Sequence, residues 1–225
     1  MNPPEPQPRS PDSDTVRRVE QNAFDAWPPA EVQTLGSWRL RFNHGVTNRA
    51  NSVWAFGPTG IPVDRAIEEA EAFYAARGQA PIFQLSPLSE PADLDARLAE
   101  RGYVRHSPVT VRVASASHAA SVPASHNIAV ETAEHLDENW FEISGMRGRY
   151  HGDAIATYRR MMERVADRAC FVVARRAGTV AGVGRGTSEL YLQVEEDNAA
   201  AQTLYRRAGF ETLYRYAYRQ KREAG

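Results

Sequence analysis

The sequence predicts an α/β (α+β) protein made of two related modules, each with a mixed sheet, and three observations lead to this prediction. Apolar, strand-like runs alternate with segments of helical periodicity along the chain. The same succession of strand, helix, glycine and strand occurs once in each half. The length of 225 residues, of which 42% are hydrophobic and 24% charged, is enough for one large domain or two small ones.

The chain divides into four predicted segments. Residues 1–15 are predicted to be a disordered tail, because five of the first eleven residues are proline and the segment has no cluster of apolar residues. Residues 16–113 form the first module, and residues 114–126 are a linker of mainly small residues. Residues 127–225 form the second module.

The first module begins with an amphipathic helix that ends near Pro28. In the next strand Trp38, Leu40 and Phe42 alternate on one face, which is the period of a half-buried strand. The remaining elements are, in order, a strand over 51–56, a helix over 64–78 with Asp64 as its N-cap and Gly78 as its stop, a strand over 81–86, a helix over 90–102 and a strand over 103–113.

The second module contains related pieces. A helix is expected from about Asp153 to Ala166, and a hairpin over 169–186 turns at Ala177 and Gly178. A strand over 189–194, a helix over 198–209 and a strand over 210–221 complete the chain.

A shift of 107 positions superimposes the ends of the two modules without a gap. Phe83 then falls on Leu190, Gly102 on Gly209 and Tyr103 on Phe210. The pattern of elements repeats although few residues are identical, so the prediction of a repeat rests on pattern.

The same comparison shows that the second module is short by a strand and a crossover helix. In the first module the helix over 64–78 separates the strands "NSVWAF" and "PIFQLS", whereas only "RGTSE" separates "VAGVG" from "LYLQV". A parallel connection needs about a dozen residues or more. The two strands of the second module are therefore either antiparallel neighbours or members of different sheets.

The closing stretch "LYLQVEEDNAAAQTLYRRAGF" resembles the GNAT (GCN5-related N-acetyltransferase) superfamily. The shared features are a strand, an Asn that opens a helix, a Tyr within that helix, and a glycine-aromatic step into the last strand. The resemblance covers about Glu131 to Lys221. The first half, with "RFNHGVTNRANSVWAF" and "LDARLAERGYV", looks like the degenerate N-terminal module of tandem members of that superfamily.

The resemblance implies an acetyl-CoA-dependent transferase and a role for several residues. Asn198 would bind the pantetheine arm of acetyl-CoA, and Tyr205 would be the general acid that protonates the departing thiolate. The strand with Leu192 and Val194 would form one wall of the cofactor cleft and pair with the pantetheine as an added strand does. The positions equivalent to Asn198 and Tyr205 in the first module are Pro91 and Leu98, which cannot take these roles.

On pattern alone these residues also have simpler interpretations. Tyr205 shares helical spacing with Ala201, Leu204 and Ala208, as a core residue does. Asn198 is a favourable N-cap. The acidic run over 195–197 could supply a base that works through water, or it could be a solvated loop.

GNAT enzymes hold the CoA pyrophosphate in a basic, glycine-rich loop that opens a helix, and this loop should follow Gly186. Only four residues, 186–189, are present there. "GVGRG" supplies glycines and Arg185, the candidate phosphate ligand, but reads more simply as the end of a strand. "RYHGDA", over 149–154, formally fits the loop pattern but precedes the hairpin, so we assign it to the acceptor side. The missing strand would also have supplied the backbone N–H that binds the thioester oxygen.

Two functions follow from this reading: an N-acetyltransferase acting on a small-molecule or peptide amine, or a non-catalytic GNAT-derived scaffold or binding module. The net charge of −1 argues against nucleic acid or an anionic membrane as a partner, and no run is apolar enough to span a membrane. Cys170, the single cysteine, excludes an internal disulfide and a cysteine-based zinc cluster and fits a cytoplasmic protein. Because the truncated module should expose a sheet edge, a homodimer is also expected.

Overall fold

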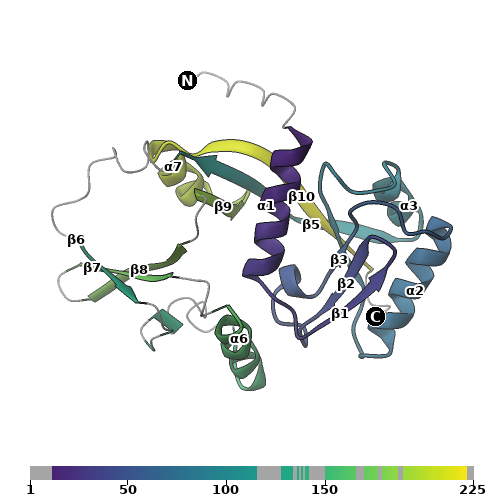
Figure 1. The fold of residues 1–225 in the computed structure, drawn as a ribbon, viewed down its shortest axis with the longest axis horizontal. Coiled ribbons are helices and arrows are strands. Elements are labelled where there is room, and N and C mark those ends of the chain that lie inside the picture. Colours follow the sequence, from purple (N-terminus) through teal and green to yellow (C-terminus); the bar gives the residue numbers. More distant parts are fainter. Residues whose placement is uncertain are drawn as a thin grey trace.

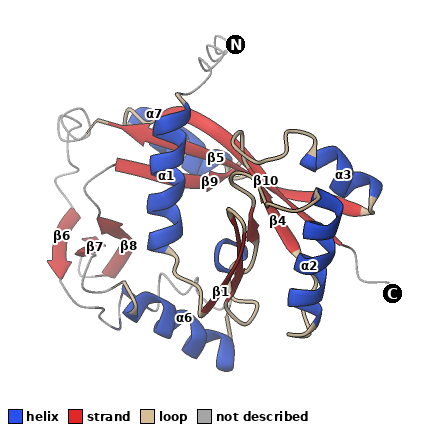
Figure 2. Cartoon of the chain, turned by 45° about the vertical axis from the view of Figure 1, so that its right-hand side comes forward, coloured by secondary structure: helices blue, strands red, loops and turns tan. Residues whose placement is uncertain are grey.

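The computed structural model describes residues 12–115, 128–133, 136, 138, 140–141, 150–165, 170–176, 179–186 and 190–221. In this part of the chain the strands form a seven-stranded mixed sheet and a three-stranded antiparallel sheet (Figure 1). Helices cover both faces of the larger sheet (Figure 2). The predicted α/β class is confirmed.

The elements follow the predicted order. The helices are α1 (Ser13–Ala26), the 3-10 helix η1 (Asn48–Ala50), α2 (Val63–Ala75), α3 (Leu94–Glu100), α6 (Asp153–Glu163) and α7 (Ala199–Arg207). The strands are β1 (Glu31–Leu35), β2 (Trp38–Phe42), β3 (Val53–Trp54), β4 (Ile82–Leu85), β5 (Tyr103–Ala114), β6 (Ile128–Ala133), β7 (Cys170–Arg176), β8 (Thr179–Gly186), β9 (Leu190–Glu195) and β10 (Glu211–Lys221). α1 begins inside the predicted tail, because the Asp12 carboxylate accepts hydrogen bonds from the first-turn N–H groups of Asp14 and Thr15. Most of the predicted linker, and the turn at 177–178, lie outside the described residues.

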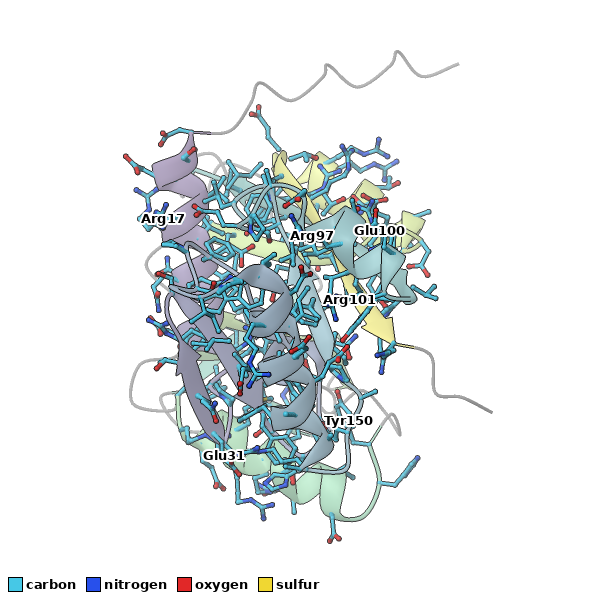
Figure 3. The ribbon with its side chains drawn as sticks, turned by 90° about the vertical axis from the view of Figure 1, so that its right-hand side faces the viewer. Arg17, Glu31, Arg97, Glu100, Arg101 and Tyr150 are labelled. Carbon is cyan, nitrogen blue, oxygen red and sulfur yellow. The ribbon has the colours of Figure 1, made fainter. Side chains whose placement is uncertain are left out.

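The predicted N-cap of α2 is wrong. Pro62 is the N-cap, and Asp64 lies in the first turn, where the negative charge of a carboxylate interacts favourably with the helix dipole. Asp64 pairs with Arg97 of α3 at 3.5 Å and with Arg101, the C-cap of that helix, at 3.2 Å; both arginines are labelled in Figure 3. The role of Asp64 is therefore to join α2 to α3.

The strand β2 is buried on both faces, so the prediction of a half-buried strand is also wrong. Trp38, Leu40 and Phe42 are buried as predicted, but Arg41 between them is only 3% exposed. The Arg41 guanidinium donates to the Ser52 carbonyl at 2.9 Å, to Ser52 Oγ at 2.6 Å and to Gln84 Oε1 at 2.7 Å. The alternation of apolar and charged residues does not show that one face is solvated, because a buried, hydrogen-bonded arginine gives the same sequence pattern as an exposed one.

The two faces of the large sheet carry separate cores. α2 and α3 pack on a cluster that includes Trp38, Phe83 and Tyr103. α1 packs on the opposite face, where its Val16 and Val19 meet β5 and the tyrosines of β10. Ile82 and Phe83 are adjacent in β4 and belong to different clusters, as the alternation of a strand requires.

The last strands of the two predicted modules are exchanged within the large sheet. Its order is β1-β2-β3-β4-β10-β5-β9. β10 therefore lies between β4 and β5 of the first half, and β5 lies between β10 and β9 of the second half. Figure 1 shows the teal β5 and the yellow β10 side by side. The strands thus do not divide into one sheet per half, because each half completes the sheet of the other.

The exchange follows the 107-residue repeat closely. Ala217 of β10 pairs with Leu85 of β4. Under the repeat, Ala217 corresponds to Thr110 and Leu85 corresponds to Leu192, so a perfect repeat would pair Thr110 with Leu192. In the structure Thr110 pairs with Val194. The difference is two residues, which keeps each side chain on the same face of the sheet. The predicted repeat is confirmed as an approximate two-fold relation between β4-α3-β5 and β9-α7-β10.

The connection from β8 to β9 joins two different sheets, which is one of the two arrangements that the sequence allowed. β8 pairs with β7 in the small sheet, and β9 pairs with β5 at the end of the large one. Among the described strands, none pairs with the outer edge of β9. The expected pairing of this edge with a second copy of the chain stays a prediction.

The equivalent helices α3 and α7 differ in burial. In the first half Leu94 and Leu98 of α3 are 1% and 0% exposed, in one cluster with α2 residues such as Ile67. In the second half α7 has no buried residue, and its Leu204 is 61% exposed. The helix that would cover α7 as α2 covers α3 is the one that the short connection omits.

This difference predicts unequal costs for two leucine truncations. Leu98→Ala should lower the free energy of unfolding by about 2–5 kcal/mol, because it leaves a cavity in a packed core. Leu204→Ala should change it by less than about 0.5 kcal/mol, because the side chain is mostly in water. Urea unfolding of both variants measures the difference, and a cost for Leu204→Ala as large as that for Leu98→Ala would show that α7 is covered in solution.

Candidate functional site

The predicted cofactor residues lie on β9 and α7, on the face of the sheet opposite α1. Tyr191 of β9 packs against the α1 face, so the alternating Leu192 and Val194 point to the other face. Val194 is 5% exposed and Leu192 is half-buried. Arg112 of β5, opposite Leu192, donates to Gln202 of α7 at 3.0 Å and holds the helix over this face.

Asn198 is the N-cap of α7. Its Oδ1 accepts a hydrogen bond from the Ala201 backbone N–H at 3.0 Å, and its carbonyl accepts from Gln202. The oxygen of the side chain is therefore engaged within the helix, whereas its amide N–H groups are not part of that bond. The N-cap interpretation and a contact from the amide nitrogen to a ligand are compatible.

Tyr205 is half-buried on α7. Its ring makes an edge contact with Phe210, with centroids 5.9 Å apart, and its carbonyl accepts from the Phe210 N–H at 2.9 Å. Its hydroxyl makes no hydrogen bond to another described residue. The interpretation of Tyr205 as a fully packed core residue does not hold, because the helix buries no side chain completely.

Arg185 lies in β8, where the structure describes the backbone only. "GVGRG" is the second half of a regular hairpin, with Val173 opposite Val183 and Phe171 opposite Arg185. No helix follows it, because residues 187–189 lead directly to β9. The structure thus places Arg185 in the small sheet, whereas the N-cap Asn198 and Tyr205 belong to α7, which follows β9 of the large sheet.

The acidic residues after β9 are exposed. Glu196 pairs with Arg215 at 3.0 Å and donates its N–H to the Pro108 carbonyl at 3.0 Å, which fixes the end of the strand. Glu195 faces the opposite side of the sheet from Val194 and lines a small cavity there.

This cavity, of about 80 Å³, was not predicted from the sequence. It is lined by the loop 47–49 and by side chains from β5, β9, β10 and the segment before α6, namely Ser107, Glu195, Tyr216, Tyr218 and Tyr150. Figure 3 labels Tyr150 in the lower part of the molecule, well away from Arg97 of α3 and its C-cap Arg101. The cavity thus lies where the first-half loop meets the exchanged strands.

The loop that carries Arg49 is built around Asn51, a side chain that is 3% exposed. Asn51 Oδ1 accepts from the N–H groups of Asn43 at 2.7 Å and Gly45 at 3.0 Å, and its Nδ2 donates to the carbonyls of Val46 and Thr47 at 2.7 and 2.8 Å. These four bonds fold residues 43–51 back on themselves. Asn43 and Asn51, the first and last residues of "NHGVTNRAN", are the sequence signal that could have indicated an ordered loop.

Tyrosine hydroxyls and one guanidinium make the wall of the cavity polar. Arg49 stacks on Trp27 at 5.1 Å from the ring centroid, and its Nε contacts the Tyr216 hydroxyl at 3.5 Å. Tyr216 donates to Gln193 at 3.0 Å and lies 3.4 Å from the Tyr218 hydroxyl. Burial raises the pKa of Tyr218 well above its usual value, so this hydroxyl stays protonated.

The segment "RYHGDA" leads into α6, before the β7-β8 hairpin. Gly152, with φ of 55°, is the N-cap of α6, and no side chain caps the helix. Tyr150 from the same segment lines the cavity on the side of the sheet away from α7. Its part in binding an acceptor stays a prediction.

In the part of the chain that the structure describes, no helix has both the length and the apolar character to cross a bilayer.

Comparison with known proteins identifies the family. The family model described as "Probable histone acetyltransferase Rv0428c C-terminal" matches residues 13–185. The match starts with α1 and ends at Arg185, directly before the short connection to β9. It covers both the predicted first module and the α6–β8 part of the second.

A curated relative agrees with this family. The uncharacterized N-acetyltransferase YobR of Bacillus subtilis is 40% identical over 90 residues, which is 40% of this chain. The match spans 35% of YobR, about a third of its length.

Solved structures share the fold. A GCN5-related N-acetyltransferase from Kribbella flavida has a TM-score of 0.68 at 13% identity, over 92% of this chain and 95% of that one. A tandem GNAT protein from the clavulanic acid biosynthesis pathway has a TM-score of 0.59 at 15% identity, over 97% of this chain and 90% of that one. The chain belongs to the family of the Rv0428c C-terminal region and, with it, to the GNAT superfamily in its tandem form.

Proposed function

We propose that this protein transfers the acetyl group of acetyl-CoA to an amine and that it binds the thioester and pantetheine part of the cofactor only. The observation that carries the proposal is the place of Tyr205 on a helix over β9. Its hydroxyl has no hydrogen-bond partner among the described residues, and the outer edge of β9 has none among the described strands. An open strand edge offers backbone N–H and C=O groups to an extended ligand such as pantetheine.

The residues present fit one end of acetyl-CoA and not the other. The edge of β9 and the amide of Asn198 suit the amide-bearing pantetheine arm. A pyrophosphate needs several free N–H groups at a helix N-terminus, and residues 187–189 are too few to form a helix. The backbone of Arg185 lies in the other sheet, and its part in binding the cofactor stays a prediction.

In the proposed reaction the amine nitrogen attacks the thioester carbonyl carbon. A C–N bond forms, the C–S bond breaks, and the Tyr205 hydroxyl gives its proton to the sulfur as the thiolate leaves. The amine loses one proton to water, and water returns one to Tyr205. The acceptor is a small-molecule or peptide amine, and it reaches the thioester around the open edge of β9.

The release of free thiol tests this proposal. The protein is incubated with acetyl-CoA, or with S-acetylpantetheine, and a panel of amines, and the thiol formed is followed with a thiol-reactive dye. Amine-dependent release with both thioesters supports the proposal. Release with neither thioester contradicts it and favours the alternative of a non-catalytic GNAT-derived binding module.

A further inference from the structure

We propose that the cavity beside Arg49 binds the carboxylate of a small amino acid, whose amine faces Glu195. This inference rests on the proposed function for the role of the bound molecule as the acceptor. The binding itself is tested without acetyl-CoA, so it can fail or succeed independently of catalysis.

The first argument is the state of the Arg49 side chain. It is half-buried and oriented by Trp27 and Tyr216, at 5.1 Å and 3.5 Å. In the described part of the chain no carboxylate forms an ion pair with it, whereas Arg159, for example, pairs with Glu138 at 2.7 Å. An oriented guanidinium that lines a cavity and has no carboxylate in contact with it is suited to bind the carboxylate of a ligand.

The second argument is the polarity of the cavity wall. Hydroxyl groups of Thr47 and Ser107 belong to residues that line it, together with the amide of Asn48. These groups donate hydrogen bonds to a carboxylate once Arg49 has drawn it in. A volume of about 80 Å³ suits the head group of a ligand rather than a whole drug-sized molecule.

The third argument is the presence of a negative charge at the same cavity. Glu195 is exposed and also lines the cavity, which places it at the mouth. It forms no ion pair with Arg49, so the two charges face the cavity separately. A ligand with a carboxylate and an ammonium group satisfies both charges, whereas a simple amine or a simple acid satisfies one.

The position of Glu195 connects this cavity to the proposed reaction. Glu195 ends β9, three residues before Asn198 opens α7. The cavity lies on the α1 face and α7 lies on the other face, with the free edge of β9 between them. An amine held at Glu195 is thus at the strand along which the thioester is proposed to bind.

The test is calorimetric titration of the full chain with three probes: L-alanine, ethylamine, which lacks the carboxylate, and propionate, which lacks the amine. We expect L-alanine to bind in the ~millimolar range, since few atoms make contact, and propionate to bind more weakly. Ethylamine should not bind. If L-alanine does not saturate the protein, or if ethylamine binds as tightly, the inference is wrong.

Two variants separate the two charges. Arg49→Gln should weaken both L-alanine and propionate by about 10- to 100-fold, as expected for the loss of a charge-assisted hydrogen bond. Glu195→Gln, an exposed change that leaves the packing intact, should weaken L-alanine and leave propionate unchanged. Equal weakening of both probes by Glu195→Gln would contradict the assigned orientation.

A control arginine and a control anion complete the design. Arg164→Gln removes an arginine that contacts the Pro28 carbonyl and Asn43 and does not line the cavity, so binding should persist. Inorganic phosphate should bind no more tightly than propionate. Tighter binding of phosphate would show that the cavity binds anions in general, and the inference of an amino acid as its ligand would be wrong.

Discussion

Glu20→Ala is expected to lower the free energy of unfolding by about 3–5 kcal/mol, because it removes the shared acceptor of a buried network. The Glu20 side chain is 1% exposed and accepts from the Tyr214 hydroxyl at 2.6 Å, Trp54 Nε1 at 3.1 Å and Gln84 Nε2 at 3.0 Å. Alanine would leave three buried donors without an acceptor. Urea unfolding measures the loss.

The effect is large because Glu20 joins both halves of the sequence. It belongs to α1, and its partners lie in β3, β4 and the exchanged strand β10. Gln21→Ala, at the neighbouring exposed position, removes only an exposed bond to Asp25 and should cost less than about 0.5 kcal/mol. Similar losses for the two variants would show that the buried network does not hold β10 in place.

The same residue predicts a pH dependence. Burial raises the pKa of Glu20 above its usual value of 4.5. The folded state then keeps a proton that the unfolded chain has released, so the stability contributed by Glu20 is full below that value and falls as the pH rises through the folded pKa. Glu20→Gln cannot titrate, and the stability of the natural chain relative to it should decrease as the pH rises above the usual glutamate value of 4.5. A difference that stays constant would show that the pKa is not raised.

Tyr205→Phe is expected to lower the rate of acetyl transfer by about 10²- to 10⁴-fold, the usual contribution of a general acid. Phenylalanine keeps the edge contact with Phe210 and removes only the hydroxyl. The loss should therefore fall on kcat, with little change in KM for the thioester. The thiol-release assay measures both parameters.

Tyr191→Phe is the matched control. It removes a hydroxyl from β9 on the opposite face of the sheet, where Tyr191 packs with the α1 cluster. Transfer should be unchanged. If both variants lose the same activity, the tyrosines act through the packing of β9, and Tyr205 is not the acid.

Pattern was sufficient to predict the individual elements and the repeat. The shift of 107 positions that pairs Phe83 with Leu190 and Gly102 with Gly209 also relates the strands in space. The missing crossover was predictable because chain length alone forbids a parallel connection across 187–189. The spacing of Val16, Glu20 and Ala23 on one helix face also contained a signal for the buried carboxylate.

The exchange of β5 and β10 was not predictable, because the alternation of a strand defines its two faces and not its two neighbours. The repeat fits two self-contained sheets as well as one shared sheet. The cavity was missed for a related reason: Arg49, Glu195 and Tyr216 are far apart in the sequence and meet only through that exchange.

The most direct test of the proposed function is a pair of calorimetric titrations, with acetyl-CoA and with S-acetylpantetheine. Because the chain keeps the strand edge and Asn198 but has no phosphate-binding loop after β8, we predict Kd values that agree within about threefold, a difference below ~0.7 kcal/mol. Acetyl-CoA binding at least tenfold tighter would contradict the account by showing that a phosphate site exists. No heat with either thioester up to millimolar concentration would also contradict it, and would leave a GNAT-derived binding module.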